Sequence, residues 1–363
     1  MSQLANENQA INLSQGFPGF NCDNELISLV TENMEKGHNQ YAPMPGILPL
    51  REIIAEKTQE LYGRNYNPDT EITITAGATQ ALFTAITTIV KEGDEVIVFE
   101  PVYDSYVPVI ELNGGTPIFL QLNSKDYSIN WKDVEKSINP KTKLIIINSP
   151  HNPTGSLLSE NDLKILAKII KGTNILILSD EVYEHIIFDG KSHESVIKYN
   201  DLAERSFVIS SFGKTFHATG WKMGYCLAPD NLMKEFRKIH QFNVFAVNTP
   251  IQYAIAEYLK RKDKYLELGK FYQEKRDFFV KGLNGSRFKI IPSYGTYFQL
   301  LDYSQITKQK DVDFAKKLTV ENKLASIPVS AFYHDDYDTK VLRFCFAKNN
   351  DILEQALNVL VKL

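Results

Sequence analysis

The segment SSFGKTFHATGWKMGY, residues 210–225, carries two lysines, Lys214 and Lys222, among small, aromatic and glycine residues. No carboxylate stands beside either lysine in the sequence. Removing an ammonium group from water is costly, so an unpaired lysine is either solvated or used in a site. In a closed site a lysine loses its proton and serves as a nucleophile and base, which predicts a chemical role for Lys214. A solvated loop lysine is the alternative, and the compact, uncharged surroundings argue against it.

A carboxylate with possible chemistry follows the apolar run 175–179. Asp180 comes directly after this run, and Tyr183 follows three residues later. A carboxylate at the end of a buried strand is paired or functional, which makes Asp180 a candidate partner for a cationic ring nitrogen. Tyr183 is spaced to turn its hydroxyl to the same side. Capping of a helix by Asp180 is the alternative that the residues leave open.

Two loop sequences suit the binding of polar ligand groups. In AGATQ, residues 76–80, Gly77 and Ala78 allow a close backbone approach, and free N–H groups at a helix start suit a phosphate. In SPHNPTG, residues 149–155, Asn152 stands before a proline and is held extended, which aims its amide at a ligand. A plain turn remains the alternative for both segments.

An arginine interrupts the apolar strand pattern VLRFCF, residues 341–346. The forked guanidinium of Arg343 suits a carboxylate, which it binds through two parallel hydrogen bonds. A buried structural ion pair is the alternative. These candidates lie far apart in the sequence, so the fold must bring them together.

Short β-rich runs with little alternation precede nearly all of these candidates, as is typical of strands buried on both faces. The predicted strands are 71–75, 95–100, 116–122, 143–148, 175–179 and 207–211. Helix patterns alternate with them at 79–90 and at 159–171, where Ser159 with an acid three residues later resembles a capping box. This alternation predicts an α/β fold with a large, mostly parallel sheet. Ligands bind at the carboxyl ends of such strands, and polar or glycine residues follow five of them.

The C-terminal third has a different pattern. Residues 237–283 are mostly helical, and beyond residue 288 strand-like pieces mix with helices at 312–321 and 351–362, which is an α+β pattern. The first 30 residues show no long element and are expected to pack against this second unit. We therefore expect an N-terminal arm at 1–30, a large domain at 31–260 and a small C-terminal domain at 261–363.

The composition limits the classes of partner. The 363 residues include 40 Lys and Arg against 44 Asp and Glu, for a net charge of −4, which argues against nucleic acid as a main partner. The three cysteines, Cys22, Cys226 and Cys345, are far apart, which predicts no metal cluster and a reducing compartment. No apolar run reaches the roughly 18 residues of a membrane span. The polar N-terminal segment lacks the features of a signal peptide, so we expect a cytoplasmic protein without a membrane partner.

Nine motifs, taken in order, resemble the class I and II aminotransferases of fold type I, which depend on pyridoxal 5'-phosphate. They are QGFP, QYAPMPG, TAGATQALF, FEPVYDSY, NSPHNPTG, SDEVYEH, SSFGKTFHATGWKMGY, VNTPIQ and LRFCFAK, and the resemblance extends from Asn12 to Lys348. Within this family the chain is similar to the kynurenine and glutamine aminotransferases and to bacterial methionine aminotransferases.

The resemblance implies transfer of an amino group from methionine, an aromatic amino acid, glutamine or kynurenine to a 2-oxo acid. The same fold also serves β-lyases that act on cystathionine or cysteine conjugates, and this activity is the alternative.

The resemblance also assigns roles to residues. It implies that Lys214 holds the cofactor as a Schiff base and then transfers the proton at the substrate Cα. Asp180 would keep the ring nitrogen of the cofactor protonated, so that the ring accepts electrons. The other cofactor-binding residues that it implies are Ala78, Thr79, Ser211 and Lys222 at the phosphate, Tyr103 stacked on the ring, Asn152 and Tyr183 at the ring 3'-oxygen, and Tyr41 from a neighbouring subunit. The substrate-binding residues that it implies are Gly16, Phe17, Asn152, Asn248 and Arg343. A homodimer with shared active sites follows from the role of Tyr41.

Overall fold

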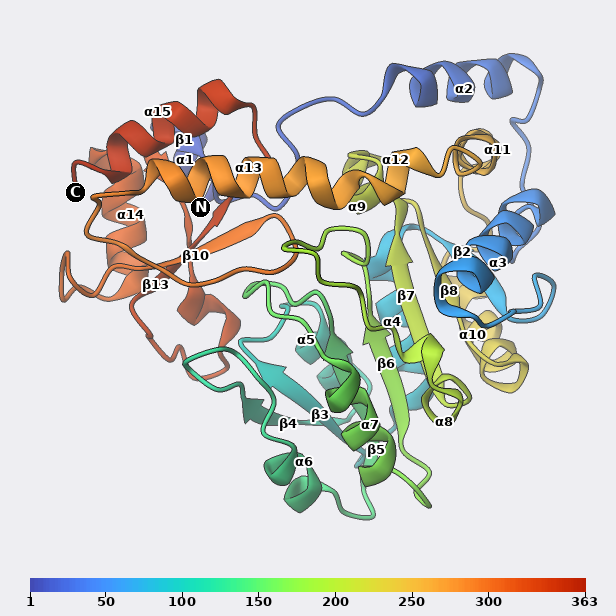
Figure 1. The fold of residues 1–363 in the computed structure, drawn as a ribbon. Helices are drawn as coiled ribbons and strands as arrows, with labels where there is room; N and C mark the ends of the chain where they lie inside the picture. The colour runs from blue at the N-terminus through green and yellow to red at the C-terminus, as the bar shows by residue number, and fades with distance from the viewer.

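The computed structural model describes all 363 residues (Figure 1). Its centre is a seven-stranded sheet in the order β2-β8-β7-β6-β5-β3-β4. The strands are β2 (Ile72–Thr75), β3 (Glu95–Glu100), β4 (Thr116–Gln121), β5 (Thr142–Asn148), β6 (Leu176–Asp180), β7 (Ser206–Ser211) and β8 (Gly224–Leu227). Strand β8 alone runs antiparallel to its neighbours, so the prediction of a large, mostly parallel sheet is confirmed.

Helices cover both faces of this sheet, because successive side chains of a strand enter opposite layers. Val96 and Val98 of β3 pack into the core beneath α4 (Gly77–Ile89), α5 (Tyr106–Leu112) and α10 (Asp230–Asn243). Ile97 of the same strand packs into the opposite core. The helices that contribute to this second core are α2 (Asn24–Glu35), α3 (Leu48–Tyr62), α6 (Trp131–Ser137), α7 (Glu160–Ile169), α8 (Asn200–Ala203) and α11 (Thr249–Tyr258).

Two local details compare sequence with structure. The predicted capping box at the start of α7 is confirmed: Ser159 Oγ accepts from Asp162 N at 3.2 Å, and Asp162 Oδ2 accepts from Ser159 N at 2.8 Å. The expectation that residues 1–30 contain no long element is wrong. Helix α2 begins at Asn24, directly after an N-cap in which Asp23 Oδ1 accepts from Glu25 N at 2.9 Å.

A second structural unit is built on a four-stranded antiparallel sheet in the order β12-β13-β10-β9. Its strands are β9 (Lys289–Ile290), β10 (Phe298–Asp302), β12 (Ile327–Pro328) and β13 (Val341–Cys345). Its core is shared with α13 (Leu268–Gly282), α14 (Asp311–Glu321) and α15 (Asn350–Leu360). Figure 1 shows that α13 follows the short α12 (Asp263–Leu266) and runs from the side of the seven-stranded sheet to the four-stranded sheet.

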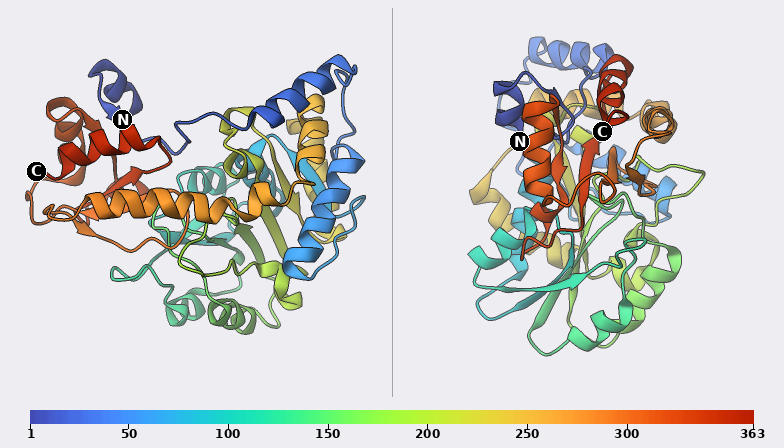
Figure 2. Two further views of the ribbon diagram at one scale, coloured as in Figure 1. Left: turned by 45° about the horizontal axis from the view of Figure 1, so that its top comes forward. Right: turned by 90° about the vertical axis from the view of Figure 1, so that its left-hand side faces the viewer.

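The N-terminal residues lie on this second unit. Strand β1 (Ile11–Asn12) pairs in parallel with β11 (Leu324–Ala325), and α1 (Ser2–Glu7) packs beside α14. Both views of Figure 2 place the two chain termini in this part of the molecule. None of the helices combines the length and apolar character that crossing a bilayer requires.

Candidate active site

A cavity of about 190 Å³ lies where β2, β3, β5, β6 and β7 end. Nine of the residues predicted from the sequence line it: Ala78, Thr79, Tyr103, Asn152, Asp180, Tyr183, Ser211, Lys214 and Lys222. An adjoining space of about 370 Å³ is lined by Gly16 and Arg343, and it shares Lys214 with the first cavity. The fold therefore brings residues from five strand ends and from the second sheet into one continuous site.

Lys214 lies on the single-turn helix α9 (Phe212–Thr215), which follows β7 without a loop. Its Nζ donates to the carbonyl oxygen of Gly16 at 3.1 Å and to the hydroxyl oxygen of Tyr297 at 2.9 Å. No carboxylate forms an ion pair with it. Burial lowers the pKa of Lys214 to about 8, so the neutral amine is a minor but substantial form near physiological pH.

Asp180 ends β6 and is 3% exposed. Its carboxylate accepts from the hydroxyl of Tyr106 at 2.5 Å and from Val182 N at 3.3 Å. No helix begins after Asp180, so it does not cap one. Burial raises the pKa of Asp180 to about 6. A cationic ring nitrogen beside it would stabilise the ionised form.

Arg343 lies in the middle of β13 and is 7% exposed. Its Nη1 donates to Asn152 Oδ1 at 2.8 Å and its Nη2 donates to the carbonyl oxygen of Ser14 at 3.3 Å, while Nε has no partner. Its guanidinium lies over the ring of Phe298 at 4.0 Å and that of Phe332 at 5.0 Å. No acidic side chain pairs with it, so the alternative of a structural ion pair does not apply. A buried, unpaired guanidinium that borders a cavity is suited to a carboxylate ligand.

The start of α4 forms an anion-binding cradle. No side chain caps this helix, and Gly77 adopts a positive φ of 77°. The backbone of Gly224 lies so close that a Cβ there would be 3.0 Å from Ala78 N. Lys222 lines the same cavity, is solvent-exposed and has no ion-pair partner. Free N–H groups at the positive end of a helix, with a nearby cation, suit a phosphate.

Two tyrosines border the space between the cradle and Asp180. Tyr103 follows β3, and burial raises its pKa to about 12. Tyr183 is 2% exposed, and burial also raises its pKa. Both phenols are therefore neutral hydrogen-bonding groups at physiological pH.

Three of the predicted residues line neither the first cavity nor the adjoining space. Tyr41 is 84% exposed, and its ring meets that of Phe245 edge-on at 5.5 Å. Asn248 caps α11, where its Oδ1 accepts from Ile251 N at 3.1 Å. Phe17 is 43% exposed, next to Gly16 at the edge of the site. The role of Tyr41 in a neighbouring subunit and the role of Asn248 near the substrate side chain remain predictions.

Sequence reasoning missed two hydroxyls of the site. Tyr106 donates to Asp180, and Tyr297 contacts Lys214. Tyr106 stands within the motif FEPVYDSY, three residues after Tyr103, and this spacing could have indicated it. No local pattern connects Tyr297 with a lysine 83 positions earlier.

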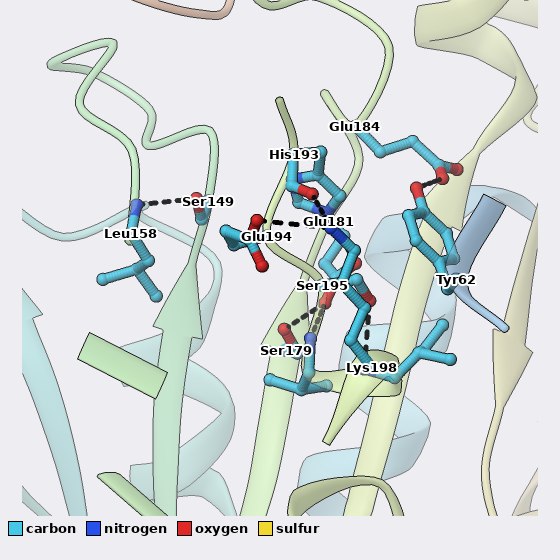
Figure 3. A network of polar contacts seen from close by, with 12 residues as sticks. Tyr62, Ser149, Leu158, Ser179, Glu181, Glu184, His193, Glu194, Ser195 and Lys198 are labelled. Atoms are coloured by element: carbon cyan, nitrogen blue, oxygen red, sulfur yellow. Dashed lines mark hydrogen bonds and ion pairs between the residues drawn. The ribbon is translucent and has the colours of Figure 1, made fainter. Parts of the chain in front are cut away.

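A buried polar network supports the turn that carries Asp180 and Tyr183 (Figure 3). Glu181 accepts from Ser179 Oγ at 2.7 Å and lies 2.7 Å from His193 Nε2. Glu184 accepts from Lys57 Nζ at 2.8 Å and from the hydroxyl of Tyr62. These bonds connect residues 181–184 to α3 and to the segment around residue 193. They therefore fix the position of the turn.

The model of the family described as aminotransferase class I and II matches residues 8–360. The chain belongs to this family. It is an aminotransferase that depends on pyridoxal 5'-phosphate and acts on amino acids and 2-oxo acids. It is 46% identical to the methionine aminotransferase of Escherichia coli over 364 residues, which cover 100% of this chain and 94% of that protein.

Further relatives agree with this assignment. The aminotransferase is 36% identical to a kynurenine–oxoglutarate transaminase of Dictyostelium discoideum over 402 residues, which cover 100% of this chain and 92% of that protein. Among solved structures, the crystal structure of an Escherichia coli methionine aminotransferase superposes with a TM-score of 0.98 at 46% identity, covering 100% of this chain and 96% of that chain. The fold-type I architecture predicted from the sequence is thus confirmed.

The site of this aminotransferase fits its cofactor. The uncapped start of α4 suits the phosphate, and Asp180 suits the protonated ring nitrogen, since neither has a charged partner within the chain. Lys214 provides an amine that burial keeps partly neutral, as a bond to an aldehyde requires. The unpartnered Nε of Arg343 leaves hydrogen-bonding capacity for a substrate carboxylate.

Proposed function

We propose that this aminotransferase takes its amino group from methionine and from aromatic amino acids, with glutamine and kynurenine as further candidate donors, and transfers it to a 2-oxo acid. The buried, unpaired guanidinium of Arg343, which borders the same space as the amine of Lys214, carries this proposal. The identities of the relatives, a methionine aminotransferase and a kynurenine transaminase, support the choice of donors.

In this proposal Arg343 binds the α-carboxylate of the substrate through its guanidinium, with the amide of Asn152 and the backbone of Gly16 beside it. The neutral amine of Lys214 then removes the proton from the substrate Cα and returns it in the next step. A positioned general base of this kind contributes about 10²–10⁴-fold to a rate. Phe17 and Asn248 are proposed to border the substrate side chain.

The proposed cofactor-binding residues divide by the part of the molecule they would hold. Ala78, Thr79, Ser211 and Lys222 would bind the phosphate, and Tyr103 would stack on the ring. Asp180 would pair with the ring nitrogen, and Asn152 and Tyr183 would donate to the ring 3'-oxygen. When bound, the cofactor supplies an electron-withdrawing ring that accepts the electron pair released at the substrate Cα.

We also propose that the enzyme is a cytoplasmic homodimer in which Tyr41 completes the neighbouring subunit's site. The exposure of Tyr41, 84%, and of Phe245 against its ring, 45%, supports this proposal, because adjoining exposed aromatic side chains are typical of a contact site. A division into an N-terminal arm at 1–30, a large domain at 31–260 and a small domain at 261–363 accompanies it.

A donor screen tests the function. Each amino acid is mixed with the cofactor-loaded enzyme, and the absorbance change of the cofactor in the first half-reaction is followed. Methionine and phenylalanine are expected to react, and a failure of both contradicts the proposed donors. A parallel assay with cystathionine measures pyruvate release, and a rate above that of amino transfer would favour the β-lyase activity instead. Lys214→Ala is expected to abolish both reactions.

A further inference from the structure

We propose that Tyr297 is a positioning residue that orients the free amine of Lys214 for proton transfer at the substrate Cα. This inference rests on the proposed role of Lys214 as the base. A lysine must have a free amine when it acts as a base. The hydrogen bonds of Nζ in this form therefore determine the orientation of the amine.

The hydroxyl of Tyr297 links the amine to the N-terminal segment. It donates to the carbonyl oxygen of Gly16 at 2.6 Å, so its single proton is used in that bond. The hydroxyl oxygen can therefore only accept from Lys214 Nζ, at 2.9 Å. The same carbonyl oxygen of Gly16 accepts a second bond from Nζ, at 3.1 Å. Three polar groups thus form a closed triangle of hydrogen bonds.

This triangle has a consequence for the neutral amine. A neutral primary amine has two N–H donors and one lone pair, and the triangle provides an acceptor for each of the two donors. The lone pair is then the part of Nζ that remains to accept a proton. When the proton leaves the substrate Cα it forms the third N–H bond of Nζ, and the electron pair of the broken C–H bond stays with the substrate.

A tyrosine suits this task better than a carboxylate. A carboxylate at the same distance would stabilise the ammonium form and reduce the fraction of neutral base. Burial raises the pKa of Tyr297, so its hydroxyl stays neutral and orients the amine without adding a charge. Its ring is held between those of Tyr183, at 5.2 Å, and Tyr272, at 5.6 Å, which fixes the position of the hydroxyl.

The test replaces Tyr297 by phenylalanine, which keeps the ring and removes the hydroxyl. We expect kcat for methionine to fall about tenfold, as loss of one hydrogen bond near a charge implies, with little change in KM. The primary isotope effect with α-deuterated methionine should increase, because proton transfer becomes more rate-limiting. In cofactor-free protein, the midpoint pH for acylation of Lys214, read by peptide mass spectrometry, should fall, since an acceptor of the ammonium form is lost.

Tyr272→Phe is the matched control. Tyr272 is a fully buried neighbour of the same type, but its hydroxyl has no hydrogen-bond partner. This variant should keep the wild-type kcat, isotope effect and acylation midpoint. A Tyr297→Phe enzyme that matches Tyr272→Phe in all three measurements overturns the proposal.

Two further measurements separate the possible failures. If Lys214→Ala retains amino transfer, the proposed base is wrong. If Lys214→Ala is inactive and Tyr297→Phe behaves as wild type, only the positioning role is wrong. Should Tyr297→Phe not fold, 3-fluorotyrosine at position 297 keeps the ring and hydroxyl while weakening the oxygen as an acceptor. It should reduce kcat in the same direction to a smaller extent, and an unchanged kcat contradicts the proposal.

Discussion

Arg343 and Asn152 are joined by a hydrogen bond of 2.8 Å between Nη1 and Oδ1, and no carboxylate shares the guanidinium. The partner amide is neutral, so the positive charge of Arg343 is available to a ligand. This pair joins the loop after β5 to β13 and borders the space next to Lys214.

Arg343→Lys should therefore weaken the binding of both amino acids and 2-oxo acids. A lysine cannot reproduce the paired hydrogen bonds of a guanidinium, and we expect KM to rise about 10²-fold or more. Steady-state kinetics with methionine and with its oxo acid measure the effect. Arg276→Lys is the control, because Arg276 pairs with Asp189 at 2.7 Å in a structural ion pair. Equal effects of the two substitutions would contradict the role of Arg343.

Asp180→Asn should stabilise the cofactor-free protein while it impairs the enzyme. Folding raises the pKa of Asp180 from 3.8 to about 6, so the ionised form is destabilised in the folded state. The destabilisation is absent below pH 3.8, develops between about pH 4 and 6 and is complete above pH 6. At pH 7 the substitution should add about 2–3 kcal/mol to the free energy of unfolding. Urea unfolding at pH 4 and pH 7 measures the effect, and a lower stability of the variant at pH 7 contradicts it.

The rate of proton transfer should depend on the pKa of Lys214. Burial lowers this pKa from 10.5 to about 8, so the fraction of neutral amine rises about tenfold per pH unit below pH 8 and levels off above it. Single-turnover rates with α-deuterated methionine between pH 6 and 10 should follow this curve. A rate that still rises without levelling off up to pH 10 would mean that the amine is not desolvated in the working enzyme.

Lys222→Ala should separate cofactor binding from chemistry. Its ammonium is proposed to neutralise the phosphate, so we expect the affinity for pyridoxal 5'-phosphate to fall roughly 10–100-fold. At saturating cofactor the variant should retain part of its activity, whereas Lys214→Ala should have essentially none. Equilibrium dialysis measures the affinity. Lys234→Ala removes a surface lysine that pairs with Asp230 and should leave the affinity unchanged.

Mixed dimers test whether Tyr41 completes the site of a neighbouring subunit. Tyr41→Ala and Lys214→Ala chains are each expected to have low activity as homodimers. When they are co-expressed, one site of each mixed dimer combines Lys214 from one chain with Tyr41 from the other. Random pairing should then restore about a quarter of the wild-type activity. No recovery in verified mixed dimers would mean that Tyr41 acts within its own chain or not at all.

The sequence predicted the sheet, and much of the site, because parallel strands place their carboxyl ends at one edge. The runs before Asp180 and Lys214 were strongly apolar, which located both strand ends closely. Strand β8 was missed because it begins with Gly224 and directly follows the glycine-containing segment that carries the two lysines. Its antiparallel direction could not be read from a local pattern.

Pairing between side chains that are distant in the sequence could not be predicted from local sequence patterns. The absence of an acidic partner for Arg343 depends on every residue that folds around it. The contact between Tyr106 and Asp180 spans 74 positions, and that between Tyr297 and Lys214 spans 83. Local spacing reports on one helix face or one strand end, so contacts of this kind emerge only from the folded chain.

The isolated charges of the site have a consequence for the lifetime of the protein in a cell. Asp180, Lys214 and Arg343 have no ionic partner within the chain, so only a bound cofactor or substrate can provide one. Binding stabilises the folded state by about 4 kcal/mol when the ligand is at a thousand times its Kd. Chains that lack cofactor are therefore expected to unfold more often than cofactor-loaded chains. Chaperones and proteases should act on them preferentially.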